Sequence, residues 1–385
     1  MKFVDEFRDG QLAEGIAGAI RKTVEVNRRY HFMEFCGGHT HAIARYGIPD
    51  LLPDNVRMIH GPGCPVCVLP IGRIDLAIRL ALEHGVILCS YGDTLRVPAS
   101  NGLSLLRAKA LVDKARGDIR MIYSPNDALK IARENPSRQV VFFAIGFETT
   151  TPPTAVALLT AEREGLQNFS VLCCHVLTPA AITHILDSPE VRDLGLVALD
   201  GFIGPAHVST VIGSQPYEFF AEEYRKPVVI AGFEPLDVMQ AILMLIRQVN
   251  TGNYRVENEF TRAVTREGNR KAQALVAECF ELRKQFEWRG LGEVPYSALK
   301  IRERLAAFDA ETRFNLTYQP VPDHKSCECG AILRGVKHPT DCKLFGMVCT
   351  PDSPMGSCMV SSEGCCAAHY TYGRHKDHPQ GHATS

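Results

Sequence analysis

The sequence predicts an α/β protein with two parallel-sheet α/β domains and a third, cysteine-rich domain, and three observations lead to this prediction. Short apolar runs alternate with helical patterns over the first 150 residues. The same alternation recurs from residue 151 to about residue 250. Beyond Asp323 the composition changes to cysteine, glycine and proline. Strand runs separated by helices are typical of parallel sheets covered by helices on both faces.

The predicted domains follow one another along the chain. We expect an N-terminal helical segment at 1–30, α/β domain I at 31–150, α/β domain II at 151–250, a helical and cysteine-rich domain III at 251–372, and a disordered tail at 373–385. The strand-like runs that support domains I and II are VRMIHG, VILCSYGD, QVVFFAIGFET, FSVLCCHVL and KPVVIAGFEP.

Domain III combines two kinds of sequence. Residues 255–310 are charged and are expected to be helical, most clearly in TREGNRKAQALVAECFELRKQFEWRG. The segment beyond Asp323 has few long apolar runs. A segment with so little aliphatic core usually needs a cross-link or a metal to hold one conformation.

Composition and charge exclude several classes of partner. The formal net charge of −1 and the pI near 6.9 give no electrostatic reason to expect nucleic acid or an anionic membrane. The N-terminus mixes acidic and basic residues, unlike a signal peptide, and no run reaches the roughly 18 apolar residues of a membrane span. We therefore expect a cytoplasmic protein.

The chain contains fourteen cysteines. Because the cytosol keeps most thiols reduced, metal binding or redox catalysis explains them better than a disulfide framework. Half of them fall between Cys327 and Cys366, and three more lie in glycine-rich loops near the start. Cys89, Cys173, Cys174 and Cys279 lie in apolar runs and are expected to pack in the core.

Cys64 and Cys67 form a CxxC pair within HGPGCPVCVLP. Two thiols at this spacing can close a disulfide ring or chelate a metal, and local dipoles can lower the pKa of one of them. The alternative is a pair of unreactive buried cysteines. The flanking glycines and prolines are unlike a core strand and favour a redox-active or metal-handling dithiol.

A second group of reactive residues lies in Glu34-Phe-Cys36-Gly-Gly-His39-Thr-His41. The two glycines let the backbone approach a ligand closely. Thiolate and imidazole suit iron or zinc. Two alternatives remain, a capping and turn role for His39 and Thr40, and a covalent nucleophile at Cys36.

The C-terminal cysteines have wide, uneven spacings, C-x12-C-x6-C-x8-C-x6-C, for Cys329, Cys342, Cys349, Cys358 and Cys365. Structural zinc sites usually have ligands two to four residues apart, which only Cys327 and Cys329 approach. The spacing therefore favours a four-thiolate iron–sulfur cluster over zinc or structural cysteines. Cys366 is expected to point away from the ligand of its neighbour.

Further polar residues follow other predicted strands. In open parallel sheets ligands bind at the carboxyl ends of strands, so the loops CGGHTH, GPGCPVC, YGDT, GFETTTP and GFIGPAH are expected to face a shared cleft. Glu34, His41, Glu148, Thr149 and His207 are candidate cleft residues. A cap for the next helix is the alternative for Glu148 and Thr149. No phosphate loop or dinucleotide fingerprint occurs in the sequence.

Together, CGGHTH, GPGCPVCVLP, GFETTTP, GFIGPAHVS and DCKLFGMVCTPDSPMGSCMVSSEGCCAA closely resemble the HypD family of hydrogenase maturation factors. The resemblance extends from Phe32 to His369. It implies two α/β domains and a cluster-bearing third domain around a central cleft. It also implies a stable complex with HypC on which iron acquires cyanide and carbon monoxide. HypE would donate the cyanide from a cysteine thiocyanate, and the hydrogenase large subunit would receive the iron.

The resemblance also implies residue roles. Cys36 would hold the iron together with a HypC cysteine, and His39 would assist it. Cys64 and Cys67 would be the redox dithiol. A [4Fe-4S] cluster would be held by Cys342, Cys349, Cys358 and Cys365, with Cys329 as an alternative ligand.

Electrons would pass from the cluster to the dithiol and then to Cys36, and the protein would be a monomer outside its complex. One alternative function is a thiol oxidoreductase resembling ferredoxin-dependent thioredoxin reductase. The other is a binding module with a structural zinc tail.

Overall fold

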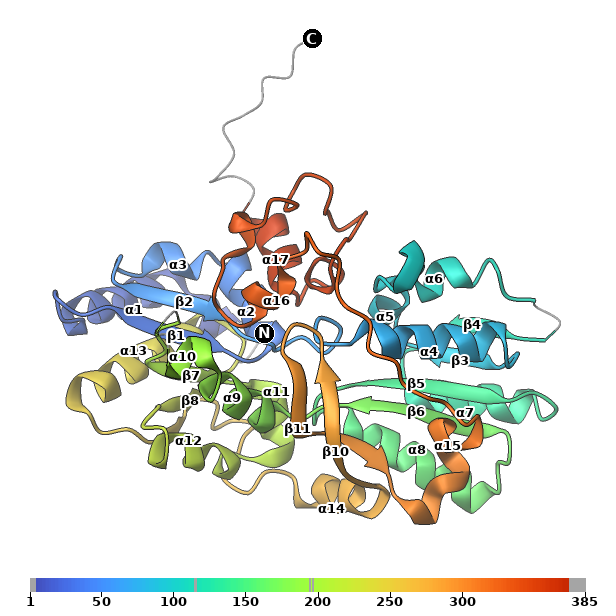
Figure 1. Cartoon of the computed structure of the whole chain (residues 1–385). Helices are drawn as coiled ribbons and strands as arrows, with labels where there is room; N and C mark the ends of the chain where they lie inside the picture. The colour runs from blue at the N-terminus through green and yellow to red at the C-terminus, as the bar shows by residue number, and fades with distance from the viewer. Residues whose placement is uncertain (1–4, 114–115, 194, 196, 374–385) are drawn as a thin grey trace, which may run out of the picture.

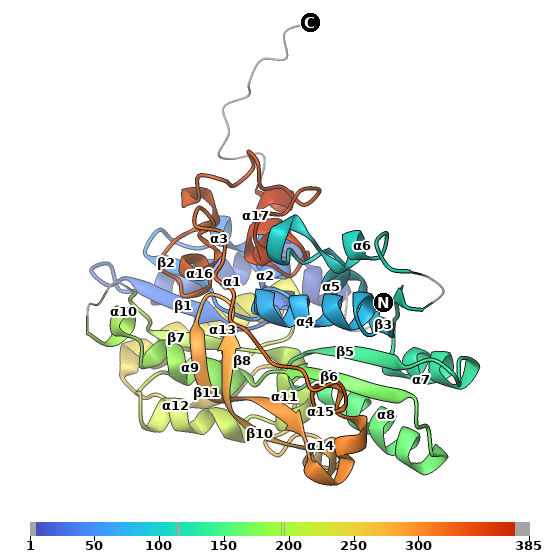
Figure 2. The ribbon, with the colours of Figure 1, turned by 45° about the vertical axis from the view of Figure 1, so that its right-hand side comes forward.

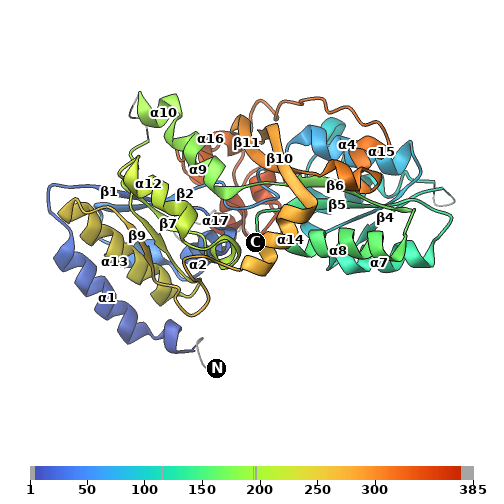
Figure 3. The same cartoon turned by 90° about the horizontal axis from the view of Figure 1, so that it is seen from below.

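Two parallel β-sheets lie side by side and form the body of the molecule (Figures 1 and 3). The computed structural model describes residues 5–113, 116–193, 195 and 197–373. An antiparallel hairpin lies across the region between the sheets, and the cysteine-rich C-terminal segment covers one side of the same region (Figure 1). The α/β class predicted from the sequence is confirmed.

The first sheet has the strand order β2-β1-β7-β8-β9, and all its neighbours are parallel. Its strands are β1 (Tyr30–Glu34), β2 (Val56–His60), β7 (Gly201–Gly204), β8 (Val228–Ile230) and β9 (Val256–Asn258). The second sheet has the order β4-β3-β5-β6, also parallel. Its strands are β3 (Ile87–Ser90), β4 (Asp118–Met121), β5 (Val140–Gly146) and β6 (Phe169–His175).

The pairing of the strands does not follow the boundary that the sequence placed between residues 150 and 151. That boundary separates β5 from β6, which pair from Val140↔Phe169 to Gly146↔His175. Strand β7 instead returns to pair with β1, with Phe32 opposite Gly201. The first sheet therefore combines the beginning of the chain with residues 201–258, because each β1 edge needs a hydrogen-bonding partner.

Helices cover both sheets, as buried parallel strands require. Helices α1 and α13 lie on the outer side of the first sheet, and α7 and α8 lie against the second (Figures 1 and 3). The helices are α1 (Gly10–Thr23), α2 (Gly37–Arg45), α3 (Ile48–Leu51), α4 (Ile71–Leu82), α5 (Gly92–Arg96), α6 (Leu105–Ala108), α7 (Pro125–Glu134), α8 (Thr151–Glu164), α9 (Thr178–Leu186), α10 (Pro189–Arg192), α11 (Ala206–Ile212), α12 (Glu218–Glu222), α13 (Pro235–Thr251), α14 (Arg270–Cys279), α15 (Ala310–Arg313), α16 (Cys329–Leu333) and α17 (Cys365–Tyr372).

The helical prediction for residues 255–310 is right for α14 and for a 3-10 helix at Glu303–Phe308, and wrong for the segment between them. That segment forms the hairpin of β10 (Phe280–Trp288) and β11 (Gly292–Ile301). This hairpin binds the end of the second sheet, where the Leu177 N–H donates to Ser297 O at 2.8 Å. Its turn contacts the CPVC loop, because the Arg289 N–H donates to Val68 O at 2.8 Å. Tertiary pairing thus overrides a charged sequence that is compatible with a helix.

The C-terminal segment folds back over the carboxyl ends of the first sheet's strands, where α17 packs on α2 (Figure 2). The four cysteines expected in the core, Cys89, Cys173, Cys174 and Cys279, are buried. Within the described part of the chain, no helix is long and apolar enough to cross a bilayer. Residues 374–385, most of the predicted tail, lie outside the described residues.

Candidate functional site

Cys36 lies between β1 and α2, at the carboxyl end of the first sheet, and begins α2 as its N-cap residue. Two glycines follow it, and both are closely covered. A Cβ on Gly37 would lie 2.5 Å from Cβ of Glu363, and one on Gly38 would lie 2.4 Å from the Phe233 ring. Glycine is therefore required for the C-terminal segment and the β8 loop to approach Cys36 this closely.

The Glu34 carboxylate organises the loop around Cys36. It is fully buried, and its Oε2 accepts a hydrogen bond from the Cys36 backbone N–H at 2.9 Å. Its Oε1 accepts from the Thr40 hydroxyl and lies 2.9 Å from His60 Nδ1. A buried carboxylate needs such partners to offset its lost hydration. Glu34 therefore connects the ends of β1 and β2 to α2.

Replacing Glu34 with alanine is expected to lower the free energy of unfolding by about 3 kcal/mol, because it leaves two buried donors and the partly buried His60 ring without their acceptor. Urea denaturation followed by circular dichroism would measure the change. The matched control is Glu83→Ala, which removes an exposed carboxylate near Arg79 and is expected to change stability by at most about 0.5 kcal/mol. A loss below about 1 kcal/mol for Glu34→Ala would contradict the organising role.

The electrostatic surroundings of Cys36 keep its thiol protonated. Burial raises the pKa of Cys36 to about 12, and the negative charges of Glu363 and Glu34 also raise it. The backbone N–H groups of Gly38 and His207 donate to the sulfur and act in the opposite direction. A thiolate at this position therefore needs a cation in place of the proton, and the N-terminus of α2 already offers it partial positive charge.

The His39 imidazole is buried in the same helix, one turn from Cys36. Its Nε2 lies 3.1 Å from Ala231 O and 2.9 Å from Gly232 O, so Nε2 carries the hydrogen. Its Nδ1 has no hydrogen-bond partner among the residues that the structure describes. Burial lowers the pKa of His39. His39 is therefore a neutral imidazole with an available acceptor nitrogen.

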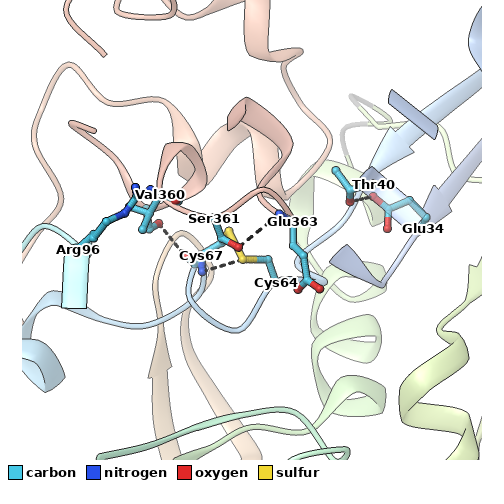
Figure 4. The surroundings of a disulfide bond; sticks show 9 residues. Glu34, Thr40, Cys64, Cys67, Arg96, Val360, Ser361 and Glu363 are labelled. Atoms are coloured by element: carbon cyan, nitrogen blue, oxygen red, sulfur yellow. Dashed lines mark hydrogen bonds between the residues drawn. A yellow bond between two sulfur atoms is a disulfide. The ribbon is translucent and has the colours of Figure 1, made fainter. Parts of the chain in front are cut away.

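Cys64 and Cys67 form a disulfide in the loop after β2 (Figure 4). This loop packs on the Cys36 loop, since Gly37 N–H donates to Gly63 O at 3.1 Å and a Cβ on Gly63 would lie 2.4 Å from Cys36 N. The disulfide and the Cys36 thiol therefore belong to two adjoining loops of one site.

Of the five loops expected to share one cleft, GPGCPVC, YGDT and GFETTTP line one cleft, CGGHTH lines another, and GFIGPAH lines neither. A cleft of about 400 Å³ beside the disulfide is lined by residues of four loops: Cys64, Pro65, Val66, Tyr91, Gly92, Asp93, Thr94, Ile145, Thr150, Ser361, Ser362 and Glu363. A second cleft of about 290 Å³ lies over α2 and includes Gly38, His41 and Arg45. Glu363 lines both clefts, between the disulfide and α2.

Most of the C-terminal cysteines lie close to one another, in the segment that covers Cys67 of the disulfide. The thiols of Cys329, Cys358, Cys365 and Cys366 interact with one another. Cys327 interacts with Cys329, and both act electrostatically on Cys349. Hydrogen bonds from the Cys358 and Cys366 thiols lower the pKa of Cys365 to about 6.

The structure differs from the sequence expectation for Cys366 and shows where Cys342 packs. Cys366 does not point away from its neighbour's surroundings, because its thiol interacts with those of Cys329, Cys358 and Cys365. Cys342 is partly buried and packs at the edge of the same core.

The donor set fits an iron–sulfur cluster in kind and number. Seven cysteines lie within residues 327–366, and five of them are buried, which suits thiolate ligands. No three His, Cys, Asp or Glu side chains form a ready metal-binding group in the described ranges. The thiols hydrogen-bond to one another in this structure. In a protein that binds a cluster, the cluster lies between its cysteine ligands and holds their sulfurs apart.

Two other predicted residues, His207 and His41, lie near Cys36 or near the smaller cleft. His207 contributes its backbone N–H to Cys36, and its ring lies 4.3 Å from the Phe233 ring. His41 lines the smaller cleft and contacts Tyr372 of α17, with His41 Nε2 3.4 Å from the Tyr372 hydroxyl oxygen.

Glu148 and Thr149 are not at Cys36. The Glu148 carboxylate accepts hydrogen bonds from Thr178 N–H at 2.8 Å and Thr178 Oγ1 at 3.0 Å. Glu148 lines a separate, largely apolar cleft of about 430 Å³, and burial raises its pKa to about 7. Glu148 therefore contacts the start of α9, whereas the next helix along the chain, which the alternative expected it to cap, is α8.

Sequence reasoning did not identify Glu363, Asp93, His60 and Phe233 as individual site residues. Each lies within or beside a quoted motif: SSEG, YGDT, HGPG and GFEP. Their positions depend on contacts between distant segments, which local spacing does not reveal.

The family model and the relatives that match this chain all indicate the same family. The family model HypD, described as "Hydrogenase formation hypA family", matches residues 11–373. A hydrogenase maturation factor HypD from Cupriavidus necator is 72% identical over 379 residues, which are 98% of this chain and 99% of that protein. The HypD of Rhizobium leguminosarum bv. viciae is 68% identical, with 98% and 97% covered. The HypD of Escherichia coli is 44% identical, with 97% and 98% covered.

Proposed function

Because this chain belongs to the HypD family of hydrogenase maturation factors, we propose that it is the scaffold on which the Fe(CN)2CO group of nickel–iron hydrogenases is assembled. The observation that supports this most is the packing of the Cys36 loop against the Cys64–Cys67 disulfide. One loop offers a thiolate for iron, and the other offers a two-electron redox pair.

The iron is cargo, and Cys36 holds it together with a cysteine of the partner HypC. Cyanide and carbon monoxide bind best to electron-rich iron, which thiolate donors favour. Iron binding replaces the proton of a thiol whose pKa is about 12. The available Nδ1 of His39 is suited to accept a hydrogen bond from a ligand. The hydrogenase large subunit then receives the loaded iron.

Electrons are needed because HypE carries cyanide as a cysteine thiocyanate, and release of cyanide from that group is reductive. The reduced Cys64–Cys67 pair supplies two electrons and closes to the disulfide. A [4Fe-4S] cluster, when bound by the C-terminal cysteines, supplies electrons one at a time.

The cluster ligands are proposed from two sets. The family resemblance implies Cys342, Cys349, Cys358 and Cys365, whereas thiol contacts join Cys358 and Cys365 to Cys329 and Cys366. Cys358 and Cys365 belong to both sets.

A second candidate function is a thiol oxidoreductase that reduces a protein disulfide. It is favoured by the cleft that reaches Cys64. It gives no role to Cys36 and to the Glu34 carboxylate beside it, which is why we prefer the scaffold.

The double variant Cys64→Ala, Cys67→Ala is expected to lower hydrogenase maturation at least tenfold, because the two-electron donor is absent. Hydrogenase activity in a strain that carries only this copy measures the effect. Cys89→Ala is the matched control, since Cys89 is buried in β3 away from the site. Maturation at the normal yield by the double variant would show that the proposed relay is wrong.

A further inference from the structure

The two sulfurs of the disulfide have different surroundings. Cys67 is fully buried, and a Cβ on Gly364, directly before Cys365, would lie 3.1 Å from its Sγ. Its carbonyl oxygen accepts a hydrogen bond from the Ser357 hydroxyl at 2.6 Å. Cys67 is thus enclosed by the C-terminal segment. Cys64 is also buried, at 3% exposure, but it lines the 400 Å³ cleft, which does not include Cys67.

We propose that Cys64 is the thiol that exchanges with an incoming cysteine carrier and that Cys67 is the resolving thiol. The cleft selects carriers that are neutral or positively charged around the reacting sulfur. The inference deepens the proposed function, since the carrier would be the thiocyanate-bearing cysteine.

The reaction takes two displacements. The Cys64 thiolate attacks the sulfur of the carrier thiocyanate, an S–S bond forms, the S–C bond breaks, and cyanide leaves with the electron pair. The Cys67 thiolate then attacks Cys64 Sγ, which closes the disulfide and releases the carrier thiolate. The dithiol loses two electrons and the thiocyanate gains two. Cyanide is released beside the Cys36 loop, because Gly63, which precedes Cys64, abuts the Cys36 backbone.

The charge of the cleft supports the selection of carriers. Asp93 and Glu363 line it, and its lining contains no Lys, Arg or His. Figure 4 shows the Glu363 side chain beside Cys64. A carrier segment rich in acidic residues would be repelled there.

Two single variants test which cysteine exchanges with the carrier and which one resolves the mixed disulfide. Reduced Cys67→Ala should react with 2-thiocyanatoethanol to give one stable mixed disulfide at Cys64 and one equivalent of cyanide, detected by peptide mass mapping and a cyanide electrode. Reduced Cys64→Ala should react at Cys67 at least tenfold more slowly. In urea the two variants should react at similar rates, which shows that the difference arises from the fold. Equal rates in the folded variants, or a faster reaction at Cys67, would overturn the proposal.

A charge series tests the cleft. The probes are 2-thiocyanatoethylamine, 2-thiocyanatoethanol and 3-thiocyanatopropionate, which are cationic, neutral and anionic. At low ionic strength Cys67→Ala should react with the cation roughly tenfold faster than with the anion, and 1 M salt should remove the difference. Adding Asp93→Asn should lower the ratio to about threefold, whereas adding Glu134→Gln, an exposed carboxylate on α7, should not change it. Equal rates for the three probes would overturn the selection.

These assays use only the purified full chain, so they are separate from the scaffold proposal. Exchange at Cys64 in a protein that never holds cyanide-bearing iron would support the inference and contradict the scaffold. Iron loading that persists without exchange at Cys64 would support the scaffold and contradict the inference.

Discussion

Replacing Cys36 with alanine is expected to abolish the binding of the iron that carries cyanide and carbon monoxide. No other cysteine thiol lies on the loop between β1 and α2, so no thiolate replaces it there. The measurement is the infrared spectrum of the complex with HypC, in which the cyanide and carbonyl bands should disappear.

The fold should survive this change, because loss of one buried sulfur costs roughly 1 kcal/mol. Circular dichroism of the variant checks this point, and Cys89→Ala, an equally conservative change in the core, should keep the bands. Bands of normal intensity in the Cys36→Ala complex would remove Cys36 from the iron site.

The double variant Cys365→Ala, Cys366→Ala is expected to lose the iron–sulfur cluster. Both thiols are buried and interact with those of Cys329 and Cys358, so their removal takes donors from the centre of the group. Iron and acid-labile sulfide should fall from about four each per chain to below about one. The control is Cys173→Ala, Cys174→Ala, a neighbouring pair in β6 that lies outside this group. A double variant that keeps its iron and sulfide would place the cluster elsewhere.

Single variants then distinguish the two ligand sets. Cys342→Ala should lose the cluster if the family resemblance identifies the ligands, and Cys329→Ala should lose it if the thiol contacts do. The structure favours Cys329, because its thiol interacts with those of Cys358 and Cys366.

Local sequence patterns were sufficient to predict the α/β class, because strand and helix periodicity are properties of neighbouring residues. They were not sufficient to assign strands to sheets. Strand β7 pairs with β1 across 166 residues of chain, from Glu34 to Gly201.

The hairpin was missed for a related reason. The sequence of β10, FELRKQFEW, carries charges at positions that either a helix or a half-exposed strand tolerates. Its pairing with β11, with a register shift between Arg283 and Gln285, decides the outcome. Local propensity is weak where such tertiary pairing is available.

The residues of the site also fall into those that the sequence could predict and those that it could not. The thiols that carry the proposed chemistry lie in contiguous motifs, so Cys36, Cys64 and Cys67 could be selected from spacing alone. Glu363 and Asp93 reach the disulfide from separate elements, and they become site residues only when the C-terminal segment folds over α2. The disposition of Cys366 likewise depends on α17, which turns its thiol towards Cys329.

The measurement that tests the scaffold most directly is iron and acid-labile sulfide content after anaerobic purification, alone and with HypC, together with an infrared spectrum of the complex. The proposal predicts about four irons and four sulfides per chain alone. The complex should hold one further iron, with cyanide and carbonyl bands. A cluster without those bands in a fully loaded complex would contradict the scaffold and favour the thiol oxidoreductase, and zinc without sulfide would contradict the redox chemistry as well.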